Sequence, residues 1–277
     1  MDRKNRRRFM QAAGAAAVAA IAAGNGRATE RSVPAGPMKL GLASYTLRKF
    51  SLDETIRMTQ RAGLRYLALK DVHLATDSTA EQIAQAAAKV KAAGLTLYGG
   101  GVIYMRNEAQ VNRAFEYAKA AGMSVIIGVA GPELLPQVEQ KVGQYDIQVA
   151  IHNHGPGDNV YPTPQAVYEK IQGLDKRIGI CHDVGHTRRV GLDPVEQTLK
   201  CADRILDVHI KDVTEASAKG GACEIGRGVL DIPRILRTIR QIGFQGVMSF
   251  EYEKDADDPL AGLAESVGYI KGVLAAM

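Results

Sequence analysis

The chain has 277 residues, 46% of them hydrophobic and 5% aromatic, which is enough to bury one large core. Its formal net charge of +5 arises in the N-terminal segment, because residues 1–28 hold six of the 35 basic and one of the 30 acidic residues. The remainder is close to neutral and poor in aromatic rings, which argues against a nucleic-acid partner.

Residues 1–28 have the features of an export signal. The segment 5–11 (NRRRFMQ) resembles the twin-arginine motif, a weakly apolar stretch covers residues 12–23, and small residues flank a basic one at 26–28. The alternative is a basic tail, since the apolar run is too short to span a membrane. We expect a signal peptide over 1–28, a linker over 29–37, a single domain over 38–277, and delivery to the periplasm by the twin-arginine export machinery.

Eight apolar, β-branched segments recur along the mature chain, each followed by a turn and an amphipathic helix. This alternation predicts an α/β fold, a single (β/α)8 TIM barrel, rather than an open doubly wound sheet. No GxGxxG motif follows the first segment, which argues against a dinucleotide-binding fold. In chain order the predicted strands are 38–46, 66–70, 95–104, 124–130, 147–155, 178–186, 204–212 and 246–253.

The predicted helices end in a recurring signal, a glycine followed by a large apolar residue. Glycine adopts the left-handed conformation that ends a helix, and the apolar residue leads into the next strand. Three cysteines without a CxxC pair are too few for a disulfide framework, so we interpret them as buried thiols. The helix-ending glycines are Gly63, Gly94, Gly122, Gly173 and Gly243, and the cysteines are Cys181, Cys201 and Cys223.

The connection from Val213 to Leu230, before the last predicted helix, is long for a barrel loop and rich in Gly, Ala and Lys. We interpret it as a lid that brings Glu224 and Arg227 to a substrate. A static surface loop is the alternative.

The histidines gather at one predicted end of the barrel. All six lie at or just after the carboxyl end of a predicted strand, the face that holds barrel active sites, and none lies on a predicted helix. They are His73, His152, His154, His182, His186 and His209.

Strand periodicity predicts a metal site within this group. Residues two apart on a strand share a face, and taking the inward set brings together His152, Asp183, His209 and Glu251 from four neighbouring strands. Two imidazoles and two carboxylates suit one divalent ion such as Mn²⁺, Zn²⁺, Co²⁺ or Fe²⁺. Taken singly, each residue also has a structural interpretation as a cap, a core histidine or half of a buried ion pair.

At these residues the chain resembles the xylose-isomerase-like family, which includes ketose 3-epimerases, hydroxypyruvate isomerase and inosose dehydratase, with endonuclease IV as a relative. The match covers the barrel from its first strand to its last, and the order of the segments is more specific than any one of them. The matching segments are LKDVHL (69–74), VAIHNHG (149–155), HDVGH (182–186), HIKD (209–212), GRGVLD (226–231) and FE (250–251).

The resemblance implies roles for single residues. Asp183, His209 and Glu251 are then metal ligands, with Mn²⁺ the first expectation, and Glu251 also transfers protons. Many members have glutamate where this chain has His152, which puts a symmetric two-base mechanism in doubt and leaves His152 as ligand or proton carrier. His186 is expected to act on the substrate or bind it. The remaining candidates for substrate binding are Lys70, His73, His154, Lys211, Glu224 and Arg227.

The chemistry that fits is proton abstraction next to a carbonyl, through an enediolate, by a sugar isomerase or epimerase. The expected substrate is a small sugar or keto-sugar, and the sequence leaves the oligomeric state open. One alternative is a lyase or hydratase that acts on 3-keto-glycosides by β-elimination. Another is a non-catalytic periplasmic sugar-binding barrel, whereas the near-neutral mature charge disfavours phosphodiester cleavage.

Overall fold

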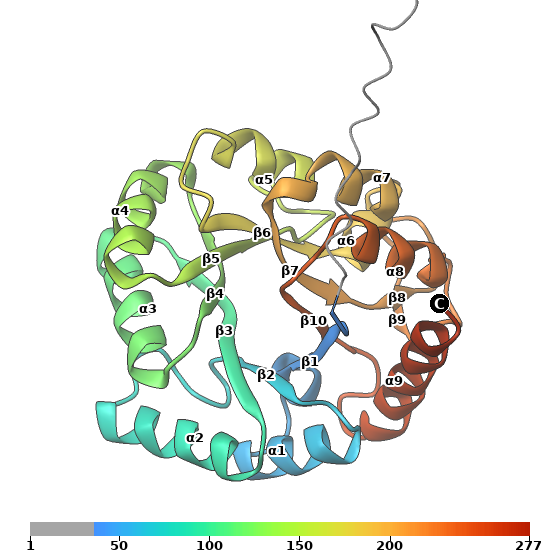
Figure 1. Cartoon of the computed structure of the whole chain (residues 1–277), viewed down its shortest axis with the longest axis horizontal. Helices are drawn as coiled ribbons and strands as arrows, with labels where there is room; N and C mark the ends of the chain where they lie inside the picture. The colour runs from blue at the N-terminus through green and yellow to red at the C-terminus, as the bar shows by residue number, and fades with distance from the viewer. Residues whose placement is uncertain (1–35) are drawn as a thin grey trace, which may run out of the picture. The chain divides into compact units, whose positions relative to one another are not determined.

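The computed structural model describes residues 36–277, which form a closed ring of eight parallel strands surrounded by helices (Figure 1). The order around the ring is β1, β10, β7, β6, β5, β4, β3, β2, which confirms the predicted TIM barrel. The barrel strands are β1 (Lys39–Ala43), β2 (Tyr66–Leu69), β3 (Thr96–Met105), β4 (Val125–Ala130), β5 (Gln148–His152), β6 (Ile178–Asp183), β7 (Ile205–Ile210) and β10 (Val247–Phe250).

Most of the helices begin at a residue whose side chain caps the first turn. At α1 the side chain of Ser51 accepts from the backbone of Glu54 while Glu54 accepts from the backbone of Ser51, and Thr79 and Gln82 repeat this capping box at α2. Proline occupies the first turn of α5, α7 and α8. The helices are α1 (Leu52–Arg61), α2 (Ala80–Ala92), α3 (Glu108–Ala121), α4 (Leu135–Tyr145), α5 (Pro164–Ile171), α6 (Val184–Arg189), α7 (Pro194–Lys200), α8 (Ile232–Gln241) and α9 (Leu260–Ala275).

Four of the five predicted helix-ending glycines adopt the left-handed conformation. Gly63, Gly94, Gly122 and Gly243 have φ between +67° and +70° after α1, α2, α3 and α8. Gly173 does not, because α5 already ends at Ile171 with Gln172 as its C-cap. A glycine followed by a large apolar residue therefore predicted the ends of four helices correctly, and the end of α5 lies before the predicted glycine.

The predicted lid contains a short antiparallel hairpin, β8 (Asp212–Val213) and β9 (Ala222–Cys223). The buried carboxylate of Asp212 accepts hydrogen bonds from the backbone N–H groups of Gly226, Gly228 and Leu230. One side chain of β8, two residues after the end of β7, therefore holds the later half of this long connection in place.

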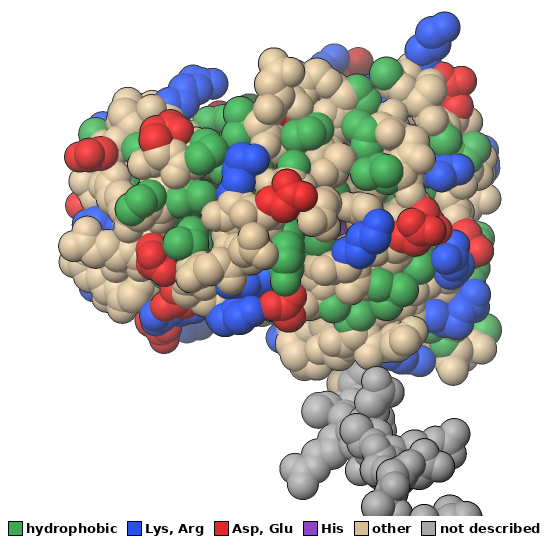
Figure 2. Space-filling model, turned by 90° about the horizontal axis from the view of Figure 1, so that it is seen from above, with side chains coloured by type: hydrophobic (Ala, Val, Ile, Leu, Met, Phe, Trp, Pro, Cys, Tyr) green, Lys and Arg blue, Asp and Glu red, His purple; other side chains and the backbone are tan. Residues whose placement is uncertain are grey.

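The predicted export signal lies outside the described residues. Within residues 36–277, no helix is both long and apolar enough to cross a lipid bilayer. The face of the molecule drawn in Figure 2 carries acidic and basic side chains in mixture. The three cysteines are free and buried, as predicted.

Candidate metal and proton-transfer site

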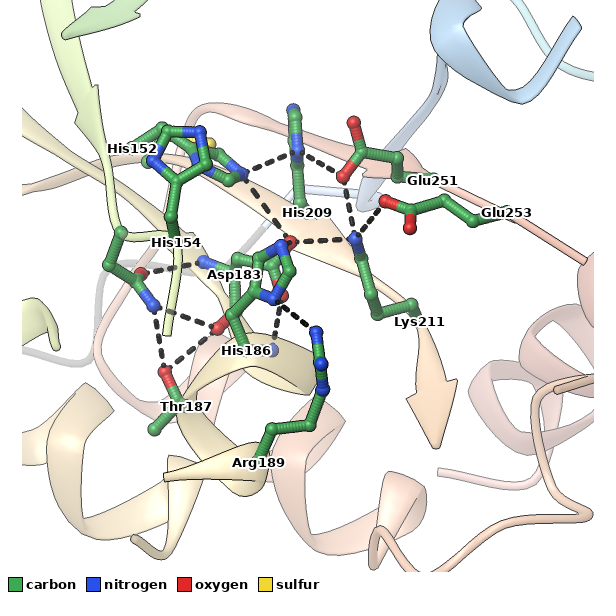
Figure 3. A network of polar contacts seen from close by, with 12 residues as sticks. His152, His154, Asp183, His186, Thr187, Arg189, His209, Lys211, Glu251 and Glu253 are labelled. Atoms are coloured by element: carbon green, nitrogen blue, oxygen red, sulfur yellow. Dashed lines mark hydrogen bonds and ion pairs between the residues drawn. The ribbon is translucent and has the colours of Figure 1, made fainter. Parts of the chain in front are cut away.

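Four predicted ligands meet at the carboxyl end of the strands (Figure 3). His152 ends β5, Asp183 ends β6, His209 lies on β7, and Glu251 directly follows β10. Because these strands are consecutive in the ring, one donor atom from each side chain lies within 4.8 Å of the others. All four side chains are buried.

The spacing of the donor atoms fits a divalent ion. His152 Nε2 lies 3.2 Å from His209 Nδ1 and 3.4 Å from Asp183 Oδ2, and Glu251 Oε2 lies 3.1 Å from His209 Nδ1. An ion with bonds of about 2.1 Å separates neighbouring ligands by about 3.0 to 3.4 Å. The residues present therefore fit the metal that the sequence predicts.

Lys211 contacts the same oxygens (Figure 3). Its ammonium lies 2.6 Å from Glu251 Oε2, 2.9 Å from Asp183 Oδ2 and 3.0 Å from Glu253 Oε1, and the side chain is buried. Gly185 makes room for it, because a Cβ there would lie 2.4 Å from Cγ of Lys211. The structure therefore places Lys211 in an ion-pair cluster beneath the cavity.

The charges of this cluster set the protonation of its members. Burial alone raises the pKa of Glu251, but Lys211 and His209 outweigh it and hold that pKa well below the usual range. The pKa of Asp183 is lowered in the same way, against burial, by His186 and Lys211. Burial lowers the pKa of His152 to about 3, so its imidazole is neutral and can bind a metal.

A cavity of about 390 Å³ opens above the cluster, a volume in the range of small-molecule sites. The ring of His154 lies 4.4 Å from that of His152, and His154 Nε2 is 3.0 Å from the hydroxyl of Tyr104. The predicted residues Lys70, His154 and His186 all line this cavity. Its lining consists of Tyr45, Lys70, Val102, Tyr104, His152, His154, His186, Glu251 and Glu253.

His186 reaches the cavity from a helix, which corrects the prediction that all the histidines lie on strands or loops. Asp183 ends β6 and caps α6, accepting from the backbone N–H of His186 at 2.7 Å. Gly155 has φ +74°, and a Cβ there would lie 2.8 Å from the carbonyl oxygen of His186. The turn after β5 can therefore pack directly against α6 beside the site.

His73, predicted to bind substrate, lies outside this cavity. Its Nδ1 is 2.9 Å from Ser44 Oγ and its Nε2 is 2.9 Å from Thr55 Oγ1. Both ring nitrogens are therefore occupied by groups that join the start of the barrel to α1. The structure thus places His73 apart from the other candidate residues, and a substrate-binding role for it stays a prediction.

Glu224 and Arg227 also lie outside the cavity. Arg227 forms a bidentate ion pair with Glu265 on α9 at 2.6 and 2.7 Å. Glu224 accepts from Tyr252 and Lys254, each at 2.8 Å. Both side chains are thus paired away from this cavity, and their contact with a substrate stays a prediction.

The sequence analysis missed the two tyrosines of the cavity wall, Tyr45 and Tyr104, and the carboxylate of Glu253. Tyr104 lies near the end of β3 and Glu253 lies two residues after Glu251, so strand position was the available signal. It also missed Asp207, a buried carboxylate two residues before His209.

Residues 51–273 match the family model described as Xylose isomerase-like TIM barrel. The chain belongs to this family. Among curated relatives, the Rhizopine catabolism protein MocC of Rhizobium meliloti is 26% identical over 136 residues, which cover 44% of this chain and 41% of that protein. The chain thus aligns with about two fifths of that relative.

Solved structures share the fold. The 3-keto-D-glucoside 4-epimerase YcjR from E. coli has 18% identity and a TM-score of 0.66, with 85% of this chain and 99% of that chain covered. The IOLI protein with a bound zinc atom has 15% identity and a TM-score of 0.70, with 86% and 99% covered. At these identities the likeness shows the fold.

Proposed function

We propose that this protein is a divalent-metal-dependent sugar isomerase or epimerase that removes a proton next to a carbonyl. The observation that carries the proposal is the meeting of two imidazoles and two carboxylates at the floor of a cavity of about 390 Å³. An epimerase and a zinc-binding protein with the same fold support it.

His152, Asp183, His209 and Glu251 would hold the ion, with Mn²⁺ the first expectation and the two imidazoles also favouring Zn²⁺. When bound, the ion supplies polarisation of the substrate carbonyl and stabilises the enediolate charge. All four side chains are buried, which limits the access of bulk water to the groups that would hold the ion.

Glu251 is the proposed base, because it is both in the donor set and in the cavity lining. His154 lines the same cavity, and burial lowers its pKa, so it enters the reaction as a neutral imidazole. Its contact with the hydroxyl of Tyr104 orients the ring. Glu251 after β10 and His154 after β5 give the substrate proton-transfer groups from two different parts of the ring.

The cavity walls suit a sugar. Tyr45 and Tyr104 offer aromatic faces, while Lys70 and Glu253 offer a donor and an acceptor for hydroxyl groups. With the proposed export to the periplasm, free sugars and keto-sugars are the substrates we expect.

Incubation of the metal-loaded protein in D2O with free aldoses, ketoses and 3-oxidised glycosides tests the function. We expect deuterium at the carbon next to the carbonyl. Glu251→Gln should slow this exchange by about 10²-fold, the scale of a general base, and retain measurable metal. Glu253→Gln is the matched comparison, since it changes a neighbouring cavity carboxylate outside the donor set. We expect it to retain metal and the exchange step, with its effect confined to substrate binding.

Each contrary result has a distinct meaning. Full exchange in Glu251→Gln with metal bound would place the base elsewhere. Loss of the aglycone with formation of an unsaturated sugar would show a lyase. Sugar binding with neither exchange nor turnover would show a binding barrel.

A further inference from the structure

A polar layer crosses the barrel interior below the four ligands. It contains Asp207 on β7, Cys181 on β6, Tyr98 on β3 and Ser249 on β10, all buried. The thiol of Cys181 donates to Asp207 Oδ1 at 3.4 Å, and the hydroxyl of Tyr98 contacts Ser249 Oγ. Barrel interiors are usually filled by branched apolar side chains, so a carboxylate here needs an explanation.

Asp207 faces one ligand from below. Its Oδ1 lies 3.8 Å from Nε2 of His209, and no other hydrogen-bond partner contacts that nitrogen among residues 36–277. Oδ2 of Asp207 is also without a partner in this part of the chain. Two buried polar atoms therefore remain incompletely satisfied at the same place, directly beneath the proposed metal.

The other ring nitrogen of His209 faces the donor cluster. Nδ1 lies 3.2 Å from His152 Nε2 and 3.1 Å from Glu251 Oε2. A histidine ligand binds a metal through an unprotonated nitrogen and usually donates its other N–H to a carboxylate or carbonyl. In this arrangement Nδ1 of His209 faces the donor cluster and Nε2 faces Asp207.

We propose that Asp207 is a positioning residue that accepts the Nε2 proton of His209 when a divalent ion takes Nδ1. A metal at Nδ1 requires that this nitrogen carries no proton, so the one proton of the neutral ring resides on Nε2, which faces Asp207. The thiol of Cys181 helps to orient the carboxylate. This inference rests on the metal site of the proposed function and adds a buried partner to it.

Asp207→Asn tests the role, because the amide keeps the shape but can donate to Nε2 and so favour the wrong tautomer. We expect Zn²⁺ affinity, measured by chelator competition, to fall about 10- to 100-fold, as for other second partners of metal-bound histidines. Ser249→Ala is the matched control in the same layer, and it should stay within about threefold of wild type, because it removes no contact of His209.

A second readout separates positioning from a general structural role. In the Zn²⁺-loaded wild type, ¹⁵N NMR of His209 should show a protonated Nε2 and a metal-bound Nδ1. Coordination through Nε2 would overturn the proposal, even if Asp207→Asn does not fold. Wild-type affinity in a folded Asp207→Asn would overturn it as well. If the wild type binds no Zn²⁺, the proposed function fails and this inference falls with it, whereas a difference confined to Asp207→Asn concerns Asp207 alone.

Discussion

At the scale of single residues, the ammonium of Lys211 competes with a divalent cation. It lies within 3.0 Å of oxygens from Asp183, Glu251 and Glu253, and two of these oxygens belong to the proposed donor set. The three carboxylates in turn raise the pKa of Lys211 well above its usual value, against the effect of burial. Lys211 thus stabilises the carboxylates without metal and opposes metal binding at the same time.

Replacing Lys211 with Met should separate these effects. The metal-free variant should lose about 3 kcal/mol or more of unfolding free energy, because buried carboxylates lose their partner. Its Zn²⁺ affinity should rise about tenfold, because a repelling charge of roughly 1.4 kcal/mol is removed. Chemical denaturation and chelator competition measure both. Lys70→Met is the control, because Lys70 is a cation of the cavity wall outside the cluster, and it should change neither the unfolding free energy nor the Zn²⁺ affinity strongly. Weaker Zn²⁺ binding by Lys211→Met would contradict this account.

The meeting of the four proposed ligands was predictable, because strand ends and a period of two place them on one face. His73 follows the same rule and still lies elsewhere, since hydrogen bonds with Ser44 and Thr55, distant in sequence, hold it. Asp207 carries no sequence signal that distinguishes it from a cap or a surface acid. Such differences depend on tertiary partners, which a linear pattern does not contain.

At the scale of elements, Asp212 decides how the long connection behaves. Its carboxylate accepts hydrogen bonds from three backbone N–H groups of residues 226–230. The ion pair of Arg227 with Glu265 adds a contact to α9. Length and glycine content predicted a lid, but composition does not reveal this anchor. His186 shows the same limit, because Asp183 both ends β6 and starts α6, where the sequence predicted a continuing strand.

Asp212→Ala should release the connection. Loss of charge-assisted hydrogen bonds to buried groups should lower the unfolding free energy by about 3 kcal/mol and expose residues 213–230 to limited proteolysis. Arg227→Ala should change stability by less than about 1 kcal/mol, because its pair is exposed. It should also keep near-normal turnover. A large rise in KM for Arg227→Ala would instead show that the connection closes over substrate.

At the scale of the whole molecule, repetition made the barrel predictable. Eight strand and helix units recur along the chain, several with a capping residue at the start and a glycine at the end of the helix, and this repetition predicts the closed ring. The observed strand ends differ from the predicted ones by a few residues. The short hairpin of β8 and β9 was not predicted, because each strand has only two residues, which is too short to show an alternation of apolar and polar side chains.

Export is a proposal for residues outside the described part of the chain. Replacing Arg6 and Arg7 with Lys should leave the protein in the cytoplasm, because the twin-arginine receptor reads both guanidinium groups. Fractionation followed by immunoblotting measures the distribution, with Arg27→Lys as the control outside the pair. Undiminished periplasmic recovery of the double variant would reject this route.

We propose that four side chains from four neighbouring strands hold one metal ion. Elemental analysis of the protein after loading with Mn²⁺ or Zn²⁺ and removal of free metal tests it most directly. We predict about one ion per chain in the wild type and in Arg227→Ala, and none in the double variant Asp183→Ala, His209→Ala. A wild type without metal, or a folded double variant with full occupancy, would contradict the account.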